Sequence, residues 1–513
     1  MKRTLQTFVL TAIAIAASGC ATNAVTGKRE LVGMSQEQEI KVGQENYRPM
    51  LQAQGGEYDV DPELTRYVSQ IGERLAAVSD RELPYEFVVL NSSVPNAWAL
   101  PGGKIAINRG LLTELQSESE LAAVLGHEIV HAAAGHTSQR QSRSSILQGV
   151  LLGAAIATSG TSFGDYAVGG ASIGAQLINQ RYGQGDELES DKYGMRYMSR
   201  AGYDPQGAVE LQQTFVRLSG DHEADWVSGL FASHPPSQKR VDANIATAAN
   251  LPAGGEVGRE SFESVMAKTM AAKPAYDIYD AANALLAEKK TAEVIDKADE
   301  AIRLFPDEGN FYALRGDARY VDKDYEKAIR NYDSAIRRRD NYFYYYLQRG
   351  RAAEQLDRYD SARADLEKSN SMLPTGLAYF SLGNIAAAQG DTAVAIEHFE
   401  KVAQGDNELA LKARTELARL DLSANPHKYI LKRCDPDESG NLVVSIKNDT
   451  GVIIDNVGFV VEFTDADGRP KSEARKIASQ LGAGEVTSVN TRLGPYTSGS
   501  NCPVRITSAT LVE

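Results

Sequence analysis

The middle of the chain repeats itself at a fixed interval, and this repeat restricts the possible folds more than any other feature. The pattern Tyr-x-x-x-Gly begins at Tyr312, Tyr346 and Tyr379, so it recurs after 34 and 33 residues. A small residue further along each unit keeps the same step, at Ala328, Ala362 and Ala395. A repeat of this length is typical of an array in which each unit buries its apolar face only against the next unit. We therefore expect residues 276–422 to form a row of stacked repeats.

This pattern resembles the tetratricopeptide repeat. Ala335 supplies the small position of a second helix, and Pro306 and Pro374 close two of the units. An earlier unit has small or apolar residues at the matching offsets, Ala282, Val294 and Ala301. We expect about four repeats over residues 275–424. The resemblance implies a groove that recruits a substrate or an assembly machine, whereas an unrelated helical bundle would rarely keep one phase over so many positions.

The stretch GHEIVHAAAGH, Gly126 to His136, holds three of the seven histidines. On a helix His127 and His131 lie one above the other, so both can turn a ring nitrogen toward one metal ion. Glu128 lies about 100° around the helix, where it can reach a water on that ion. This spacing is typical of zinc hydrolases, although two solvated histidines on an amphipathic helix are the alternative. A catalytic zinc also needs a third protein ligand.

The segment Glu187-Leu-Glu-Ser-Asp191 resembles the Glu-x-x-Ala-Asp motif of the HtpX and CAAX-prenyl-protease family of gluzincin metallopeptidases, with Ser190 in place of alanine. The resemblance implies that Glu187 is the third zinc ligand and that Asp191 orients a histidine ligand. Glu189 points elsewhere on the helix and is expected at the surface. We interpret His136 as a structural hydrogen-bonding residue and not as a ligand.

Two further motifs extend the resemblance over about residues 35–245. Asn96-Ala97-Trp98-Ala99-Leu-Pro-Gly-Gly resembles a family signature, with tryptophan in place of phenylalanine, and implies an edge strand that pairs with an extended substrate backbone. The His-Pro loop at His234 resembles that of periplasmic, repeat-carrying BepA-type members. It implies that His234 can plug the fourth zinc position and that Arg240 anchors the loop by a salt bridge. The alternative is a surface histidine before a proline turn.

The N-terminus has the pattern of an export signal. Lys2 and Arg3 precede an apolar run over 5–17 that is too short to span a bilayer. Small residues then lead into Cys20, which resembles a lipobox. We expect a signal peptide over 1–19, a lipidated Cys20 and a tether over 20–34, with an ordinary secretory signal as the alternative. The residue after Cys20 is Ala21 and not aspartate, which in lipoproteins of enteric-type bacteria favours the outer membrane over the inner one.

Charge and cysteine content agree with an exported protein. Without Lys2 and Arg3, 52 basic and 68 acidic residues remain of the 54 and 68 in the whole chain, a net charge of −16, which excludes a nucleic-acid partner. Cys434 and Cys502 remain as one even pair, so we expect a disulfide, with two buried free thiols as the alternative.

These patterns predict a multidomain chain. A mainly helical zincin-type α+β peptidase domain over 35–250 has strands near 85–90 and 98–108. A linker over 251–274, the repeats and a small C-terminal β-sandwich over 425–513 follow. Alternating residues at 441–447 and 457–463, with a turn at Asp465–Gly468, predict strands of the last domain.

The expected function is that of a zinc endopeptidase at the periplasmic face of a bacterial membrane. Its expected substrates are unfolded or misassembled proteins of the outer membrane. One Zn²⁺ would activate water, with Glu128 as the general base. The alternative is a chaperone or scaffold for envelope protein assembly in which His234 keeps the zinc site closed.

Overall fold

The computed structural model describes residues 20–31, 34–139, 182–221, 233–405, 407–464, 469–495 and 502–512. The chain divides into two compact units, Met1–Ala352 with Lys368–Leu373 and Ala353–Glu367 with Pro374–Glu513. The expected signal peptide and the turn at Asp465–Gly468 lie outside the described residues. Among the helices of the described ranges, none combines the length and the apolar character needed to cross a bilayer.

The first unit begins with a two-stranded hairpin, β1 (Cys20–Thr22) and β2 (Arg29–Leu31), in which Cys20 pairs with Leu31. The sequence predicts a tether over 20–34. The hairpin contradicts this part of the prediction. A tether needs few contacts with the domain, whereas Val25 of this hairpin is only 6% exposed and belongs to the main hydrophobic core.

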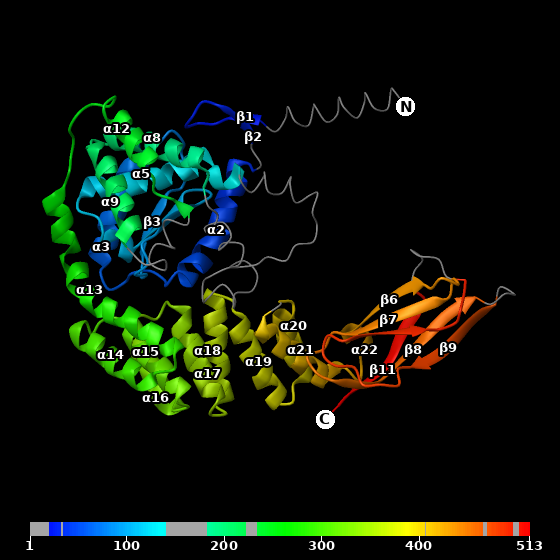
Figure 1. Cartoon of the computed structure of the whole chain (residues 1–513). Coiled ribbons are helices and arrows are strands. Elements are labelled where there is room, and N and C mark those ends of the chain that lie inside the picture. Colours follow the sequence, from blue (N-terminus) through cyan, green and yellow to red (C-terminus); the bar gives the residue numbers. More distant parts are fainter. Residues whose placement is uncertain are drawn as a thin grey trace, which may run out of the picture. The chain divides into compact units, whose positions relative to one another are not determined.

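The peptidase part of this unit is a small sheet surrounded by helices (Figure 1). In the sheet, β5 lies in the middle, parallel to β3 and antiparallel to β4. The strands are β3 (Glu86–Leu90), β4 (Ala97–Leu100) and β5 (Lys104–Asn108). The helices are α2 (Gln36–Ala53), α3 (Pro62–Ala76), α4 (Arg109–Leu112), α5 (Glu118–Ala134), α8 (Gln184–Arg200), α9 (Gln206–Asp221) and α12 (Gln238–Ala248).

Local sequence signals explain where the helices begin and end. The Ser35 hydroxyl accepts from Gln38 N while the Gln38 side chain accepts from Ser35 N, which closes the first turn of α2. Ser117 similarly accepts from Glu120 N at the start of α5. Gly135 ends α5 in the left-handed conformation at φ 70°, which only glycine adopts without strain.

The expected linker over 251–274 is partly wrong. Helix α13 (Arg259–Ala287) runs through Pro274 without interruption, and its residues Phe262 and Met266 are buried in the core of the peptidase part. A glycine-rich start at 253–258 resembles a linker, but the apolar side chains that follow pack against the sheet domain and make the segment a structural support.

The repeats form successive antiparallel helices, as the sequence predicts. Gly316 and Gly383 occupy positions where a Cβ would lie 2.7 Å and 2.6 Å from the rings of Tyr332 and Phe399, so the paired helices need a residue without a side chain there. After α13 come α14 (Thr291–Leu304), α15 (Gly309–Val321), α16 (Tyr325–Ile336), α17 (Phe343–Glu354), α18 (Tyr359–Met372), α19 (Gly376–Ala388), α20 (Thr392–Ala403) and α21 (Glu408–Asp421).

The second unit ends in two antiparallel sheets of three strands each, in the orders β10-β7-β6 and β11-β8-β9. Their inner faces share one core with Val444, Phe459 and Ile506. A disulfide between Cys434 and Cys502, with Cα atoms 5.3 Å apart, joins β6 to the chain before β11. The elements are α22 (Pro426–Tyr429), β6 (Ile430–Pro436), β7 (Leu442–Asn448), β8 (Ile454–Thr464), β9 (Pro470–Lys476), β10 (Val486–Asn490) and β11 (Val504–Leu511).

Candidate metal centre

Helices α5 and α8 supply most of the site, and glycines let them approach closely. A Cβ on Gly194 would lie 3.0 Å from backbone atoms of Gly126 and His127. Because neither glycine has a side chain, the two helix backbones can lie nearly in contact. The histidines of α5 therefore face the carboxylates of α8 across a short distance.

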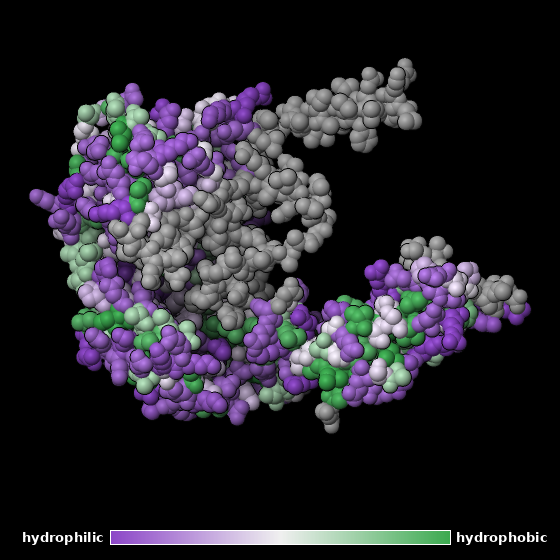
Figure 2. Space-filling view, viewed as in Figure 1, coloured by the Kyte–Doolittle hydropathy of each residue, from purple (hydrophilic) through white to green (hydrophobic). Residues whose placement is uncertain are grey.

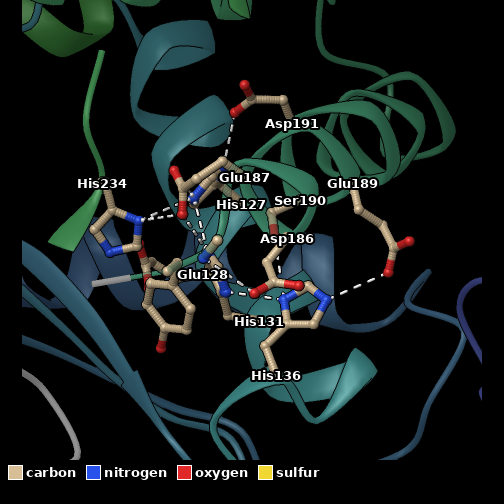
Figure 3. A network of polar contacts seen from close by, with 12 residues as sticks. His127, Glu128, His131, His136, Asp186, Glu187, Glu189, Ser190, Asp191 and His234 are labelled. Carbon is tan, nitrogen blue, oxygen red and sulfur yellow. Dashed lines mark hydrogen bonds and ion pairs between the residues drawn. The ribbon is translucent and has the colours of Figure 1, made fainter. Parts of the chain in front are cut away.

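Four side chains converge on one point (Figure 3). Nε2 of His127 and Nε2 of His131 are 2.9 Å apart. Nδ1 of His234 lies 3.1 Å from Oε1 of Glu187 and 3.3 Å from Nε2 of His127. All four residues are buried, and one possible ligand atom from each lies within 4.8 Å of the others. Ligand atoms around a tetrahedral zinc lie about 3.3 Å apart, so this donor set fits the ion.

Glu128 lies beside this cluster and is only 2% exposed. Its Oε1 is 3.7 Å from Nε2 of His234. Among the residues that the structure describes, none is a hydrogen-bond partner for its Oε2. A buried carboxylate oxygen without a partner is costly, so it marks a place where a water or a substrate atom is expected.

A second layer of side chains orients the His127 ring. Nδ1 of His127 lies 2.9 Å from Oδ1 of Asp191. Arg240 donates to both carboxylate oxygens of Asp191, from Nε and Nη2, at 2.7 Å each. Nη1 of Arg240 is also 2.7 Å from Oε2 of Glu187, an ion-pair contact that lacks hydrogen-bond geometry. The same nitrogen donates to the carbonyl of Pro235, which joins Arg240 to the loop that carries His234.

The ring of His131 is held differently. Its Nδ1 lies 2.9 Å from Nδ1 of His136, whose Nε2 is 3.3 Å from Oε1 of Glu189. The expectation that Glu189 is a surface residue is therefore wrong, and its side chain is only 15% exposed. His136 follows Gly135, which ends α5 in the left-handed conformation, so the position of its ring does not follow from regular helical spacing. The Tyr182 ring also packs on His131, with centroids 3.9 Å apart.

Burial and neighbouring charges set the protonation of these groups. Burial raises the pKa of Glu128 and lowers that of His131 well below its ordinary value. Burial would also raise the pKa of Glu187, but its interactions with His234, His127 and His131 hold it well below its usual range. For His234 the carboxylates of Glu187 and Glu128 outweigh burial and raise the pKa. A bound cation would favour the deprotonated form of every ligand.

A pocket opens beside the cluster. Its polar lining includes His127, Glu128, Asp191, His234, Arg240 and Asn244, and its apolar lining is Leu111, Ala123, Val124, Met195, Ala208, Leu211 and Phe215. Gln212 of α9 also lines the pocket and is 2% exposed, and no described residue bonds its Oε1. Gln212 is not predictable from the sequence, because a single glutamine in a helix carries no recognisable pattern.

The strand of the Asn96–Ala99 motif is terminal in its sheet. Within the described residues β4 pairs only with β5, so its other edge has no strand neighbour. Asn96 Oδ1 and Trp98 Nε1 are buried and have no hydrogen-bond partner among those residues. The side chains of this strand are not part of the metal cluster. Of the remaining predicted site residues, Cys20 begins β1, and the two cysteines of the disulfide lie in the second unit.

Comparison with known proteins agrees with this geometry. Residues 62–247 match peptidase family M48, and residues 279–343 and 347–410 match the tetratricopeptide repeat. The chain is similar to a putative beta-barrel assembly-enhancing protease of Vibrio cholerae, with 31% identity over 37% of this chain and 40% of that protein. It is also similar to the mitochondrial metalloendopeptidase OMA1 of Arabidopsis thaliana, with 31% identity over 32% of each chain.

A third relative is the metalloprotease YcaL of Escherichia coli, with 29% identity over 36% of this chain and 73% of that protein. The alignments with the beta-barrel assembly-enhancing proteases of Vibrio cholerae and Yersinia pestis span 40% and 34% of their lengths. The resemblance seen in the motifs is confirmed: the chain contains a peptidase family M48 domain followed by tetratricopeptide repeats.

Proposed function

We propose that this protein, which carries a peptidase family M48 domain followed by tetratricopeptide repeats, is a zinc-dependent endopeptidase. The observation that carries the proposal is the convergence of His127, His131 and Glu187 beside Glu128, whose Oε2 has no hydrogen-bond partner within the described part of the chain. A structural metal site would need no free carboxylate next to its ligands. A hydrolytic site needs one.

The reaction assigns a separate task to each residue. Zinc, when bound by His127, His131 and Glu187, supplies an activated water and polarises the substrate carbonyl. Glu128 accepts a proton from the attacking water and passes it to the leaving amine. Burial raises the pKa of Glu128, which brings this carboxyl closer to the neutral range where a proton acceptor and donor works best.

Asp191 and Arg240 prepare the site for this reaction. Asp191 accepts the Nδ1 proton of His127, which leaves Nε2 as the metal-binding nitrogen. The two hydrogen bonds from Arg240 fix the Asp191 carboxylate in that orientation. The edge of β4 is a suitable place for an extended substrate to add a strand, through backbone contacts from Asn96 to Ala99.

His234 regulates this centre as a reversible plug in our proposal. Its Nδ1 lies among the other possible ligand atoms, so His234 would be a fourth protein ligand for a bound metal and would take the place of a water. Arg240 anchors the loop through the Pro235 carbonyl. Displacement of His234 would open the fourth position without moving the three other ligands.

The N-terminal sequence and the names of relatives support a proposal for the substrates and the location. Two of those relatives are named beta-barrel assembly-enhancing proteases. We propose that the substrates are unfolded or misassembled outer-membrane proteins, and that the repeats recruit them or the assembly machinery. A lipid on Cys20 would hold the protein at the periplasmic face of the outer membrane.

The second candidate function is a chaperone or scaffold that binds envelope proteins and rarely cuts them. The position of His234 in the fourth ligand place favours this alternative. Glu128 favours the peptidase, because a permanently closed zinc site has no use for a general base.

The test compares purified mature wild type, Glu128→Gln, His234→Ala and His427→Ala on an unfolded outer-membrane protein. His427 is exposed and serves as the matched histidine control. Zinc content is measured for each protein. We expect cleavage by wild type, little or none by Glu128→Gln, and a gain in His234→Ala alone. If wild type and His234→Ala are both as inert as Glu128→Gln despite bound zinc, the peptidase proposal fails.

A further inference from the structure

The N-terminal hairpin is organised around one side chain, Asn23. Its backbone N donates to the carbonyl of Lys28 at 2.8 Å, and its carbonyl accepts from Gly27 N at 2.9 Å. Its Oδ1 accepts from the backbone N of Val25 at 2.9 Å and of Thr26 at 3.2 Å. The turn that presents Lys28 therefore has a defined conformation of its own.

This hairpin is docked on the C-terminal end of α5, the helix of the His-Glu-x-x-His motif. The last carbonyls of a helix have no partner within it and need one from elsewhere. Asn23 Nδ2 donates to the carbonyl of Ala134 at 2.9 Å, and the bond is buried. Gln139 Nε2 donates to the same carbonyl at 2.9 Å and to Oε2 of Glu30, in β2, at 2.6 Å.

A line of polar contacts leads from the hairpin to a metal ligand. Nζ of Lys28 lies 3.0 Å from Oε2 of Glu189, across 161 positions of sequence. Oε1 of Glu189 is 3.3 Å from Nε2 of His136, and Nδ1 of His136 is 2.9 Å from Nδ1 of His131. Figure 3 shows the last part of this line, with His136 between His131 and Glu189.

The chemistry of the ligand determines the direction of each hydrogen bond. Nε2 of His131 faces the other ligand atoms, so it must offer a lone pair and its proton must be on Nδ1. Nδ1 of His131 then donates to Nδ1 of His136, which places the His136 proton on Nε2. That proton is donated to Glu189, whose other oxygen accepts from Lys28. Each donor meets an acceptor, and this order holds only while Glu189 is an acceptor on both sides.

We propose that the hairpin is a built-in part of the metal centre, which positions His131 through Lys28, Glu189 and His136. His127 has a direct carboxylate partner in Asp191. The corresponding carboxylate for His131 is Glu189, which reaches it through the ring of His136. The positively charged Lys28 holds that carboxylate in place. This inference rests on the proposed function, because it requires that the centre binds zinc.

The experiment measures zinc affinity by competition with a chromogenic chelator, for wild type, Lys28→Met, Glu189→Leu and Glu189→Gln. Loss of an outer partner of a metal ligand weakens binding by about 10- to 100-fold. We expect a loss of about 10-fold in Glu189→Leu, a smaller loss in Lys28→Met, and partial rescue in Glu189→Gln, whose side-chain oxygen still accepts from His136.

Lys41→Met is the matched control. Lys41 is 75% exposed, against 67% for Lys28, and is paired with a glutamate, Glu45, of its own helix. The thermal midpoint of the metal-free proteins is measured in parallel and should barely change in Lys28→Met, since exposed ion pairs add little stability. Affinity equal to wild type in Lys28→Met overturns the inference, whatever Glu189→Leu shows, as does an equal loss in Lys41→Met. A wild type that binds no zinc overturns the proposed function as well.

Discussion

At the scale of single residues, the metal centre depends on pairs in which each side chain fixes the protonation of the next. Asp191 shows this most directly, since it receives His127 on one oxygen and Arg240 on both. Burial would raise the pKa of Asp191, but the Arg240 charge holds it below its ordinary value. The carboxylate is therefore ionised and available as an acceptor for His127.

Asp191→Asn should lower zinc affinity by about 10- to 100-fold, because the amide no longer attracts the Nδ1 proton of His127 as a carboxylate does. Chelator competition measures the affinity. Asp242→Asn on α12, where the aspartate is exposed, is the control and should bind zinc like wild type. Equal affinities in all three proteins would contradict a role for Asp191 in orienting the ligand.

The buried carboxyl of Asp317 in the repeats should make the stability of the protein depend on pH. It accepts hydrogen bonds from Tyr332 and Tyr344, at 2.8 Å and 3.0 Å, and burial raises its pKa to about 7. An unfolded aspartate has a pKa of about 3.9. Since the folded state prefers the protonated form, the stability due to this group is complete below about pH 4 and is lost as the pH rises toward 7.

Asp317→Asn, which stays neutral, should therefore lose less stability than wild type between about pH 5 and pH 8. Urea unfolding midpoints at several pH values measure this slope. The exposed Asp322, replaced in the same way, should leave the slope unchanged. Parallel slopes in wild type and Asp317→Asn would show that Asp317 is ionised throughout.

At the scale of secondary-structure elements, the contact between α5 and α8 sets the geometry of the ligands. It depends on Gly126 and Gly194, whose backbones lie where side chains would otherwise separate the helices. Helix α8 also offers a natural comparison, because a Cβ on its Gly185 would have nothing within 4 Å.

Gly194→Ala should destabilise the protein by about 1–3 kcal/mol, since the added Cβ meets backbone that cannot move without shifting a helix. Zinc affinity should fall with it, because Glu187 and Asp191 move with α8. Gly185→Ala should be neutral or slightly stabilising. Thermal unfolding and chelator competition measure both effects. If Gly194→Ala behaves like Gly185→Ala, the close approach of the helices is not required.

At the scale of the whole molecule, the first repeats and the peptidase part share one compact unit. Glu308 joins them: it is 1% exposed and accepts from Asn91 Nδ2 at 2.8 Å and from the Tyr276 hydroxyl at 2.5 Å. The Arg109 guanidinium stacks on the same tyrosine, 3.4 Å from its ring centroid.

In the second unit, exposed apolar residues such as Ile453 and Val486 lie on the C-terminal domain of two sheets. Figure 2 shows hydrophobic side chains on the visible face of that domain.

Glu308→Ala should lower the stability of the first unit by about 1–3 kcal/mol for each donor left without its partner. In calorimetry, the unfolding of the repeats should begin to separate from that of the peptidase part. Glu293→Ala, at an exposed position of α14, is the control. An unchanged single transition in Glu308→Ala would mean that this network does not couple the two parts.

Much of this protein was determined by its sequence alone. The phase of the repeats, the helix boundaries at Ser35 and Ser117, the cysteine pair and the facing of His127 and His131 are consequences of local geometry, which spacing reveals. Other features were decided only by the tertiary structure. His234 lies beside His127 although 107 positions separate them in the sequence. Lys28 lies beside Glu189 across 161 positions. Those contacts join a loop and a hairpin to helices that are distant in the sequence, so only the packing of the folded chain brings the residues together.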